Sequence, residues 1–380
     1  MRIDNLLILA YCLIAVSCSH GETDVPDAPV STYPDDGAIR VTTLVNGNIL
    51  GRSNAVPTPF SGDDFQLFID PSEKLVNGVD ANSDYHFQLK VEKTPGTTDW
   101  GVFSGTYGKT SPYIPLGNKV PLWAGPREQT EVKAYANYID YTATITSLLL
   151  DQSTAEMSAA NDLLYFYKSL LPGTDLDSSS KKLVIDFTHR LSQLNIILKF
   201  GTEFNRVEPD KTMDKALIKN VGIYEMQYTY SFDIASKLVA GSDGKFTYPL
   251  AEATGSASLL TDLVSDPTGV AHIVPYISKT LAQNVTASTI TYTALVVPQK
   301  MDAGRHLVVI TMYPMGADGK ADTNGTIRNF VYTITDVAGI TFESGKAYNL
   351  TLTVGKDQIT GGTFSPAVWG EGSKDETITD

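Results

Sequence analysis

The sequence contains very little cysteine. Its 380 residues include two, Cys12 and Cys18, and both lie near the start of the chain. The rest of the chain therefore has no disulfide and no thiolate metal site. Positive charge is also scarce: 29 Lys and Arg stand against 43 Asp and Glu, a net charge of −14. This balance argues against a nucleic-acid partner, because such proteins present a basic surface to phosphate groups.

The motifs of several enzyme classes are absent as well. The five histidines are scattered, with no HExxH motif, and the sequence has no P-loop, no G-x-S-x-G elbow and no G-x-G-x-x-G. We therefore expect no metal, no cofactor and no enzymatic activity, although dispersed carboxylates leave a secreted hydrolase open. His189 is interpreted as a hydrogen-bonding structural residue. The loop around Asp318 and Asp322 is interpreted as a hairpin tip, since its register does not fit a calcium loop.

The start of the chain predicts export. Residues 1–18 contain an apolar run, Leu6 to Val16, that is too short for a stable membrane anchor and fits a secretory signal. It ends in Ala-Val-Ser-Cys, which resembles the lipobox of bacterial lipoproteins, and this resemblance implies that Cys18 is lipidated. The alternative is a simple secretion signal with an incidental cysteine. Residues 19–37 are polar, acidic and rich in proline, which predicts a flexible tether.

The body shows the two-residue period of β-strands. In the stretch 348–354, Tyr, Leu and Val alternate with Asn and Thr, which is typical of a half-buried strand. Ten further runs rich in Val, Ile, Thr, Tyr and Phe are separated by turn signals such as Asn-Gly and Pro-Gly. A helix is predicted only over Thr154 to Lys168. No apolar run of membrane-spanning length follows residue 18. The pattern predicts an all-β protein built from β-sandwiches.

Four segments together resemble the fimbrillin family, the type V pilins of anaerobic Gram-negative bacteria. In chain order they are Ile39–Thr42 with Gly51-Arg52 and Phe60–Phe65, Tyr113–Leu116 with Val132–Tyr138, Asn161–Tyr165 with Leu183–Leu194, and Gly345–Leu352 with Val368-Trp369. The resemblance implies two transthyretin-like β-sandwich domains, which we place at 38–202 and 203–380. It also implies a lipid-anchored subunit of surface fimbriae on the outer membrane, with other fimbrial subunits and a host or bacterial surface ligand as partners.

The resemblance further implies assembly by strand exchange after cleavage by an Arg-specific protease. A sandwich that lacks one strand exposes unpaired backbone groups, which a strand of a neighbouring subunit can pair with. Ile39, Val41, Thr43 and Val45 share one face and are the predicted exchangeable strand. Arg52 and Arg40 are the candidate cleavage sites; Arg52 is preferred, because it follows glycine and precedes two prolines in a predicted flexible link.

Two alternatives remain open from the sequence. The stretch 359–368 could donate a strand to a neighbour or belong to the second domain, so stalk, tip and accessory roles are all possible. Three tryptophans and many tyrosines could instead form a platform that stacks on sugars, as in a surface glycan-binding lipoprotein that does not polymerise. Aromatic residues in sandwiches are more often part of the core, which favours the fimbrial interpretation.

Overall fold

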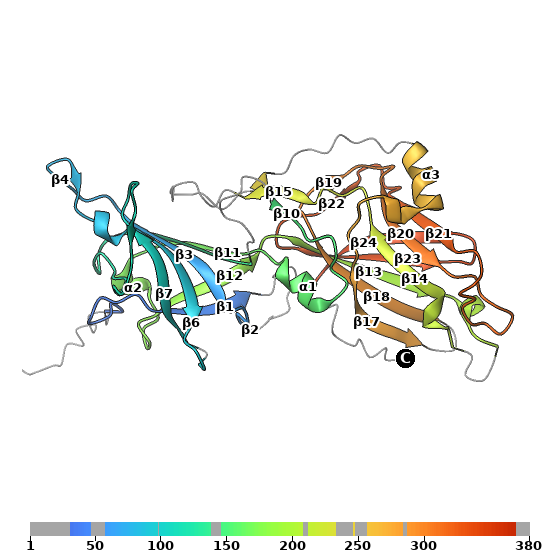
Figure 1. The fold of residues 1–380 in the computed structure, drawn as a ribbon, viewed down its shortest axis with the longest axis horizontal. Helices are drawn as coiled ribbons and strands as arrows, with labels where there is room; N and C mark the ends of the chain where they lie inside the picture. The colour runs from blue at the N-terminus through green and yellow to red at the C-terminus, as the bar shows by residue number, and fades with distance from the viewer. Residues whose placement is uncertain are drawn as a thin grey trace, which may run out of the picture.

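The computed structural model describes residues 31–46, 58–97, 99–137, 146–207, 212–232, 246–247, 257–283 and 287–369. Within these residues the fold is all-β, as the alternating pattern predicts, with short helices between the strands. The strands form two lobes that lie side by side along the long axis of the molecule (Figure 1).

The first lobe is a single curved sheet that closes on itself. Its order is β2-β1-β12-β11-β9-β3-β6-β7-β8, and a bridge between Val41 and Trp100 also joins β1 to β7. The two halves of the sheet therefore face each other across one core. The strands are β1 (Val41–Asn46), β2 (Thr58–Pro59), β3 (Asp64–Pro71), β6 (Phe87–Lys93), β7 (Trp100–Tyr107), β8 (Ile114–Pro115), β9 (Thr130–Ala136), β11 (Leu164–Leu170) and β12 (Leu183–His189).

Strict alternation of side chains builds this core. In β3, Phe65, Leu67 and Ile69 are buried, while the residues between them are more exposed. Such a period of two is what a strand with one buried face requires. A separate small hairpin, β4 (Leu75–Val76) and β5 (Val79–Asp80), follows β3 and projects from the lobe, ahead of a 3₁₀ turn at Ser83–Tyr85.

The second lobe packs a five-stranded sheet against a three-stranded sheet. The orders are β17-β18-β13-β23-β24 and β14-β20-β21. The strands of these sheets and of the smaller ones beside them are β10 (Thr146–Ser147), β13 (Ser192–Phe200), β14 (Ile218–Ile223), β15 (Thr229–Phe232), β16 (Phe246–Thr247), β17 (Tyr276–Gln283), β18 (Ser288–Val296), β19 (Lys300–Met301), β20 (His306–Met312), β21 (Arg328–Thr333), β22 (Ile340–Thr341), β23 (Ala347–Val354) and β24 (Ile359–Ala367).

The helices are short. They are α1 (Ala155–Ala160), α2 (Pro172–Asp175) and α3 (Ala257–Ser265). Thr154 caps α1 by accepting a hydrogen bond from the backbone N–H of Met157 at 3.2 Å. The prediction of a helix from Thr154 to Lys168 is wrong beyond Ala160, because residues 164–170 pair with β9 as strand β11. Among the described residues, no helix has the length and apolar character needed to cross a membrane.

The chain passes from one lobe to the other between β12 and β13. Strand β12 pairs with β1 and β11 of the first lobe, and β13 pairs with β18 and β23 of the second. Only Arg190 and Leu191 separate these strands. The predicted boundary at residue 202 lies after β13, which belongs to the second lobe. We therefore propose 190–191 as the boundary between the domains.

The segment before β1 is docked on the first lobe. The Thr32 backbone N–H donates to the Gly173 carbonyl at 3.0 Å, and the Ile39 N–H donates to the Pro121 carbonyl at 2.9 Å. The side chain of Thr32 is buried. These contacts correct the predicted tether over 19–37: its last residues are held on the folded body, and residues 19–30 lie outside the described residues.

Candidate functional site

Strand β1 carries the predicted exchangeable residues, and it is paired unequally on its two sides. Toward β12 it forms a parallel ladder of six residue pairs, from Val41 with Leu183 to Asn46 with Thr188. On its other side it meets two residues of β2 and one residue of β7. A strand paired fully on one side and sparsely on the other lies close to a sheet edge, where backbone groups are open to a further strand.

The inward side chains of β1, together with Ile39 two residues before the strand, enter the core of the first lobe. Ile39, Val41 and Thr43 are 1%, 2% and 5% exposed, and Val45 is partly buried against the same cluster. These four residues therefore share one face, as their spacing predicts. Arg40, between them, is exposed. These side chains are part of the core of the first lobe and do not merely cover its surface.

A hydrogen bond fixes the register of this strand. Trp100 on β7 donates from Nε1 to Thr43 Oγ1 at 2.9 Å, and both side chains are buried. Trp100 belongs to an aromatic group beneath β1, in which its ring lies 5.0 Å from Phe65 and 5.9 Å from Phe60. Sequence reasoning missed Trp100 as the partner of Thr43. A buried indole needs a hydrogen-bond acceptor, but the pattern alone does not identify it.

A groove of about 730 Å³ lies between β7 and the segment Ala38–Val41, which leads into β1. Lys182 and Asp99 both line it, with Lys182 Nζ 4.0 Å from Asp99 Oδ1. Its other lining residues include Ala38–Val41 on one wall and Gly101–Phe103 on the opposite wall. The groove thus borders the segment that leads into β1 and the first residue of the strand, Val41.

Of the two candidate cleavage sites, Arg40 and Arg52, Arg40 lies within the described residues. Arg40 immediately precedes β1, and its guanidinium forms hydrogen bonds of 2.5 and 2.9 Å with the carboxylate of Asp36. The bonds from Arg40 and from the Ala38 N–H hold the pKa of Asp36 well below its usual range. The Arg40 carbonyl accepts from the Leu183 N–H at 2.8 Å. Arg52 and the lipidation candidate Cys18 lie outside the described residues.

A second group of side chains lies where the lobes join. His189, the last residue of β12, places Nδ1 2.8 to 2.9 Å from the carboxylate of Asp162. Its ring stacks on Trp369 at 3.9 Å between centroids and 20° between planes. His189 is thus a hydrogen-bonded structural residue, as predicted. The contact with Trp369 was not predicted, because 180 residues of sequence separate the two rings.

Buried amides strengthen the same junction. Gln152 Nε2 donates to the Leu295 carbonyl at 2.9 Å, and Gln152 Oε1 accepts from the Leu295 N–H at 2.8 Å. Asn161 Oδ1 accepts from the Leu149 N–H at 2.7 Å. Because these side chains replace backbone partners in the interior, they hold the loop before α1 against the second lobe.

The tryptophans do not form a platform for sugars. Trp100 and Trp123 are 9% and 2% exposed, and Trp369 is partly covered by its stack with His189. Stacking on a sugar requires an accessible ring face. The burial of Trp100 and Trp123 removes two of the rings on which the glycan-binding alternative depends, whereas Tyr113 is exposed.

Other predicted features have a structural role. Asp318 Oδ1 accepts from the Lys320 N–H and Asp322 Oδ1 from the Asn324 N–H, so both carboxylates cap turns of one loop. Within the described ranges, no group of three or more His, Cys, Asp and Glu side chains is arranged to hold a metal ion.

Comparison with known proteins gives a consistent set of matches. The family model described as fimbrillin-like matches residues 80–369. No curated protein matches the chain.

Solved structures match over most of their length. A candidate cell adhesion protein from Bacteroides uniformis is 15% identical, with 88% of this chain and 98% of that chain covered and a TM-score of 0.43. A fimbrial protein from Bacteroides vulgatus is 13% identical over 88% and 99%, with a TM-score of 0.41. The tip fimbrial protein Mfa3 from Porphyromonas gingivalis, truncated at its C-terminus, is 10% identical over 81% and 94%, with a TM-score of 0.36.

Proposed function

The chain belongs to the fimbrillin-like family, and from this premise we propose that it is a structural and adhesive subunit of cell-surface fimbriae. Its partners are then other fimbrial subunits and a ligand on a host or bacterial surface. Family membership favours a non-enzymatic protein. Export as a lipoprotein, with Cys18 carrying the lipid, would anchor the subunit on the outer membrane.

The proposed assembly step is the exchange of β1. The observation that carries this proposal is the combination of a buried inward face with unequal pairing: among the described residues, all six residues of β1 pair with β12, and three of them also pair on the other side. Removal of β1 would uncover the core beneath it and the N–H and C=O groups of β12. A strand of a neighbouring subunit could then pair with β12 by β-augmentation. Because each such contact joins different surfaces of two subunits, the product is an open filament.

The strand that replaces β1 must make interactions of similar strength, because the departure of β1 removes buried contacts from the first lobe. Burial of Ile39, Val41 and the methyl group of Thr43 stabilises the lobe, at roughly 1.5–3 kcal/mol for each fully buried aliphatic side chain. The Trp100 N–H would also lose its acceptor. The incoming strand must therefore supply apolar side chains at alternate positions and an acceptor opposite Trp100. Parallel pairing with β12 is slightly weaker per residue than antiparallel pairing, which favours exchange.

The proposed trigger is proteolysis at Arg52 or Arg40. Cleavage at Arg52 would separate β1 from the chain that follows it, whereas cleavage at Arg40 would release only the segment before β1. The Arg40 backbone is held on Leu183, and its side chain is held by Asp36. A protease needs an extended, unpaired backbone, so Arg52 is the preferred site.

The experiment treats the full chain with an Arg-specific protease and follows the product by mass spectrometry, by SDS-resistant ladders and by tryptophan fluorescence. We expect cleavage after Arg52, followed by a red shift of the tryptophan fluorescence emission as Trp100 becomes exposed. SDS-resistant ladders of linked subunits should appear afterwards. Arg52→Lys should abolish all three, whereas Arg40→Lys, the matched control, should leave them unchanged. A chain that is cut at Arg52 but keeps β1 in place and stays monomeric would contradict strand exchange.

A further inference from the structure

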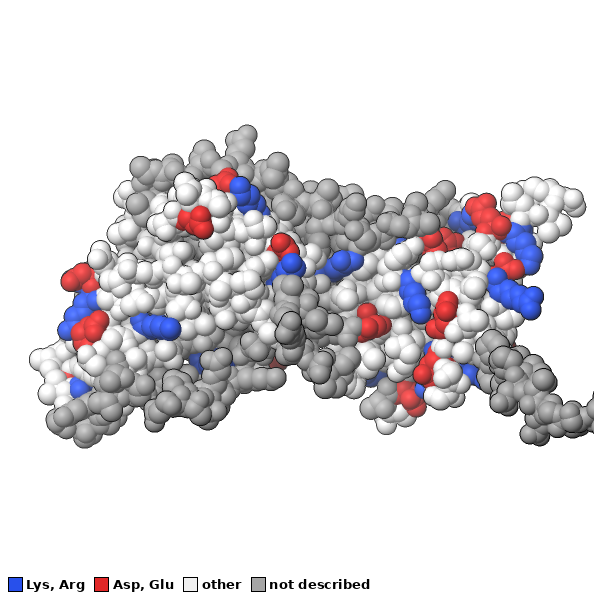
Figure 2. Space-filling view, turned by 180° about the vertical axis from the view of Figure 1, so that it is seen from behind, with Lys and Arg blue, Asp and Glu red and all other residues white. Residues whose placement is uncertain are grey.

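The hairpin formed by β4 and β5 presents an apolar tip to solvent. Leu75, Val76 and Val79 are 62%, 57% and 67% exposed. The turn between them, Asn77-Gly78, has φ angles of 54° and 80°, as a tight two-residue hairpin loop requires. The hairpin projects from the end of the first lobe that faces away from the second lobe (Figure 1), and it is an uncharged projection in the surface view (Figure 2). A soluble protein rarely exposes three such residues together without a partner for them.

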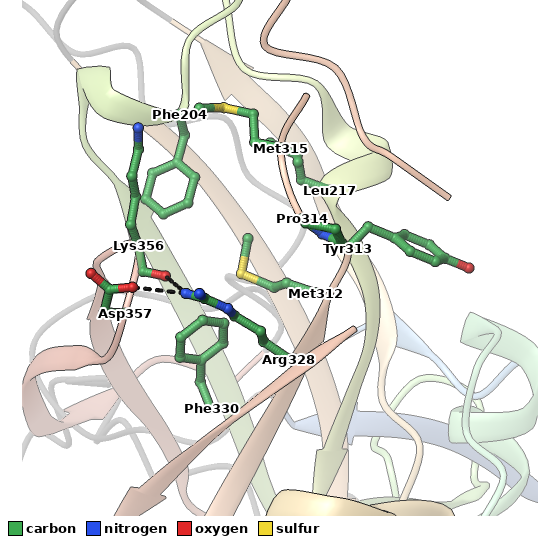
Figure 3. A pocket seen from close by; sticks show the side chains of 10 residues that line it. All are labelled: Phe204, Leu217, Met312, Tyr313, Pro314, Met315, Arg328, Phe330, Lys356 and Asp357. Carbon is green, nitrogen blue, oxygen red and sulfur yellow. Dashed lines mark hydrogen bonds and ion pairs between the residues drawn. The ribbon is translucent and has the colours of Figure 1, made fainter. Parts of the chain in front are cut away.

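The opposite end of the molecule carries a pocket of about 310 Å³, lined by apolar side chains with charged groups beside them (Figure 3). It opens between the two sheets of the second lobe, where β13, β20 and β23 end. Phe204, Leu217, Met312 and Phe330 are its buried walls, and Met315 is partly buried beside them. At about 30 Å³ for each water molecule, its volume is equivalent to about ten waters, enough for a few aliphatic side chains. Methionine walls adapt to the shape of such an insert.

The charges around the two features are complementary. Two exposed cations, Arg328 and Lys356, stand at the mouth of the pocket with one exposed carboxylate, Asp357, which lies 2.7 Å from Arg328 Nη1. Near the hairpin base, the carboxylates Glu73, Asp80, Asp84 and Glu128 outnumber the cations Lys74 and Lys109, which pair with Glu128 and Glu73. An apolar tip with a net acidic base therefore fits a pocket with apolar walls and a net basic rim.

We propose that the occupant of this pocket is the β4–β5 hairpin of a second copy of the same chain. The hairpin and the pocket lie at opposite ends of one elongated molecule, so their contact joins subunits end to end and leaves both features free at the two ends of the row. Such a heterologous contact builds a filament and not a ring. The inference deepens the proposed fimbrial function: it adds a docking contact that does not involve β1 and aligns neighbours before or after strand exchange.

The test is disulfide trapping between single-cysteine variants of the full chain. Cys12→Ser and Cys18→Ser remove the native thiols. Val76→Cys places a thiol at the hairpin tip of one protein, and Lys356→Cys places a thiol at the exposed rim of the pocket in the other. The two proteins carry different affinity tags. They are mixed without protease and then mildly oxidised. Val337→Cys is the control for the hairpin: it is a more accessible valine than Val76, 96% against 57% exposed, and it lies beyond the end of β21 that is away from the pocket.

We expect at least tenfold more mixed disulfide for Val76→Cys with Lys356→Cys than for Val337→Cys with Lys356→Cys. A Val79→Asp change in the hairpin protein should reduce the yield about tenfold, and 1 M salt should reduce it less. Equal yields for the two valines, or no effect of Val79→Asp, would overturn the proposal. Because no protease is used, trapping without any later ladders would refute strand exchange alone, whereas ladders without trapping would refute the docking contact alone.

Discussion

The first and last strands of the folded body, β1 and β24, both lie at or near a sheet edge, yet they are held in different ways. Strand β1 inserts its inward side chains into the core and pairs in parallel with β12. Strand β24 pairs antiparallel with β23 along its whole length, and most of its residues are exposed or only partly buried. Loss of β1 would leave a hole in a core, whereas loss of β24 would uncover a sheet edge. The position of a strand at an edge therefore does not by itself decide what its removal costs.

The largest effect is expected when isoleucine is changed to alanine in the segment that leads into β1, and the same change in β24 serves as the comparison. Ile39→Ala deletes a side chain that is 1% exposed and should lower the free energy of unfolding of the first lobe by about 2–5 kcal/mol. Ile359→Ala removes a partly buried side chain at the start of β24 and should cost less than half as much. Urea unfolding of both variants measures the difference. Equal losses would remove the distinction between a core-filling strand and a covering strand.

A smaller effect is expected from the polar anchor of β1. Thr43→Val keeps the shape of the side chain but leaves the buried Trp100 N–H without its acceptor, which should cost about 1–3 kcal/mol. Thr42→Val, on the opposite face of the same strand, should change stability by less than about 0.5 kcal/mol. Hydrogen exchange of the β1 amides should increase in the first variant only. Unchanged exchange would mean that the indole does not hold the strand.

The stability of the first lobe is expected to depend on pH through His86. His86 is buried, and burial opposes its charge, but hydrogen bonds with Asp70 and Asp80 outweigh burial and raise the pKa of His86 above its ordinary value. Lys109 approaches Asp80 at 3.5 Å and also pairs with Glu73. A raised pKa in the folded state stabilises at pH values below the ordinary histidine pKa, and this stability is lost as the pH rises through the folded value.

His86→Gln should therefore destabilise the first lobe by about 1.5–3 kcal/mol at pH 5, where the wild-type imidazolium forms charge-assisted hydrogen bonds. The difference should shrink at pH 9, because the stability contributed by the charge is lost as the pH rises through the raised pKa of His86. Thermal unfolding at both pH values provides the measurement. A difference that is constant with pH would mean that His86 acts through packing and not through its charge.

The smallest expected effect concerns the end of β24. Trp369→Ala removes the stack on His189 and should cost about 0.5–1.5 kcal/mol. Amide exchange should accelerate in the last residues of β24, next to Ala367, but not in β1. Faster exchange in β1 would show that the two strands are coupled through the junction.

The sequence predicted the strands that alternate or are rich in Val, Ile, Thr, Tyr and Phe, and it missed strands that lack both signals. Residues 64–70 and 194–200 alternate regularly and fall within β3 and β13. The stretch 359–368, expected either to be donated or to belong to the second domain, contains β24, which pairs with β23 of the second lobe. Strand β7 was missed, because glycines such as Gly105 interrupt the pattern. The glycine in β7 is required, because its φ is 135° and a Cβ there would lie 2.1 Å from the Gln88 carbonyl oxygen.

The candidate site was also predicted only in part, because the sequence shows local alternation but not which distant residues come into contact. Alternation alone placed Ile39, Val41 and Thr43 on one face, because a strand's faces follow from its period. The parallel partner β12 and the indole acceptor could not be deduced, since both depend on contacts between residues more than 50 positions apart. The helix predicted after Thr154 failed at Leu164, where pairing with β9 overrides local propensity.

The passage from β12 to β13 has a mechanical consequence. Its two residues are both tied by their backbones: the Arg190 N–H donates to the Leu163 carbonyl at 2.9 Å, and the Leu191 carbonyl accepts from the Gly345 N–H at 2.9 Å. A link that is this short and hydrogen-bonded on both residues leaves little room for a hinge. Tension along the long axis would pass directly from one sheet to the other, so each subunit should behave as a stiff rod. A fibre of such rods would bend where subunits meet, and its flexibility would be a property of the joints.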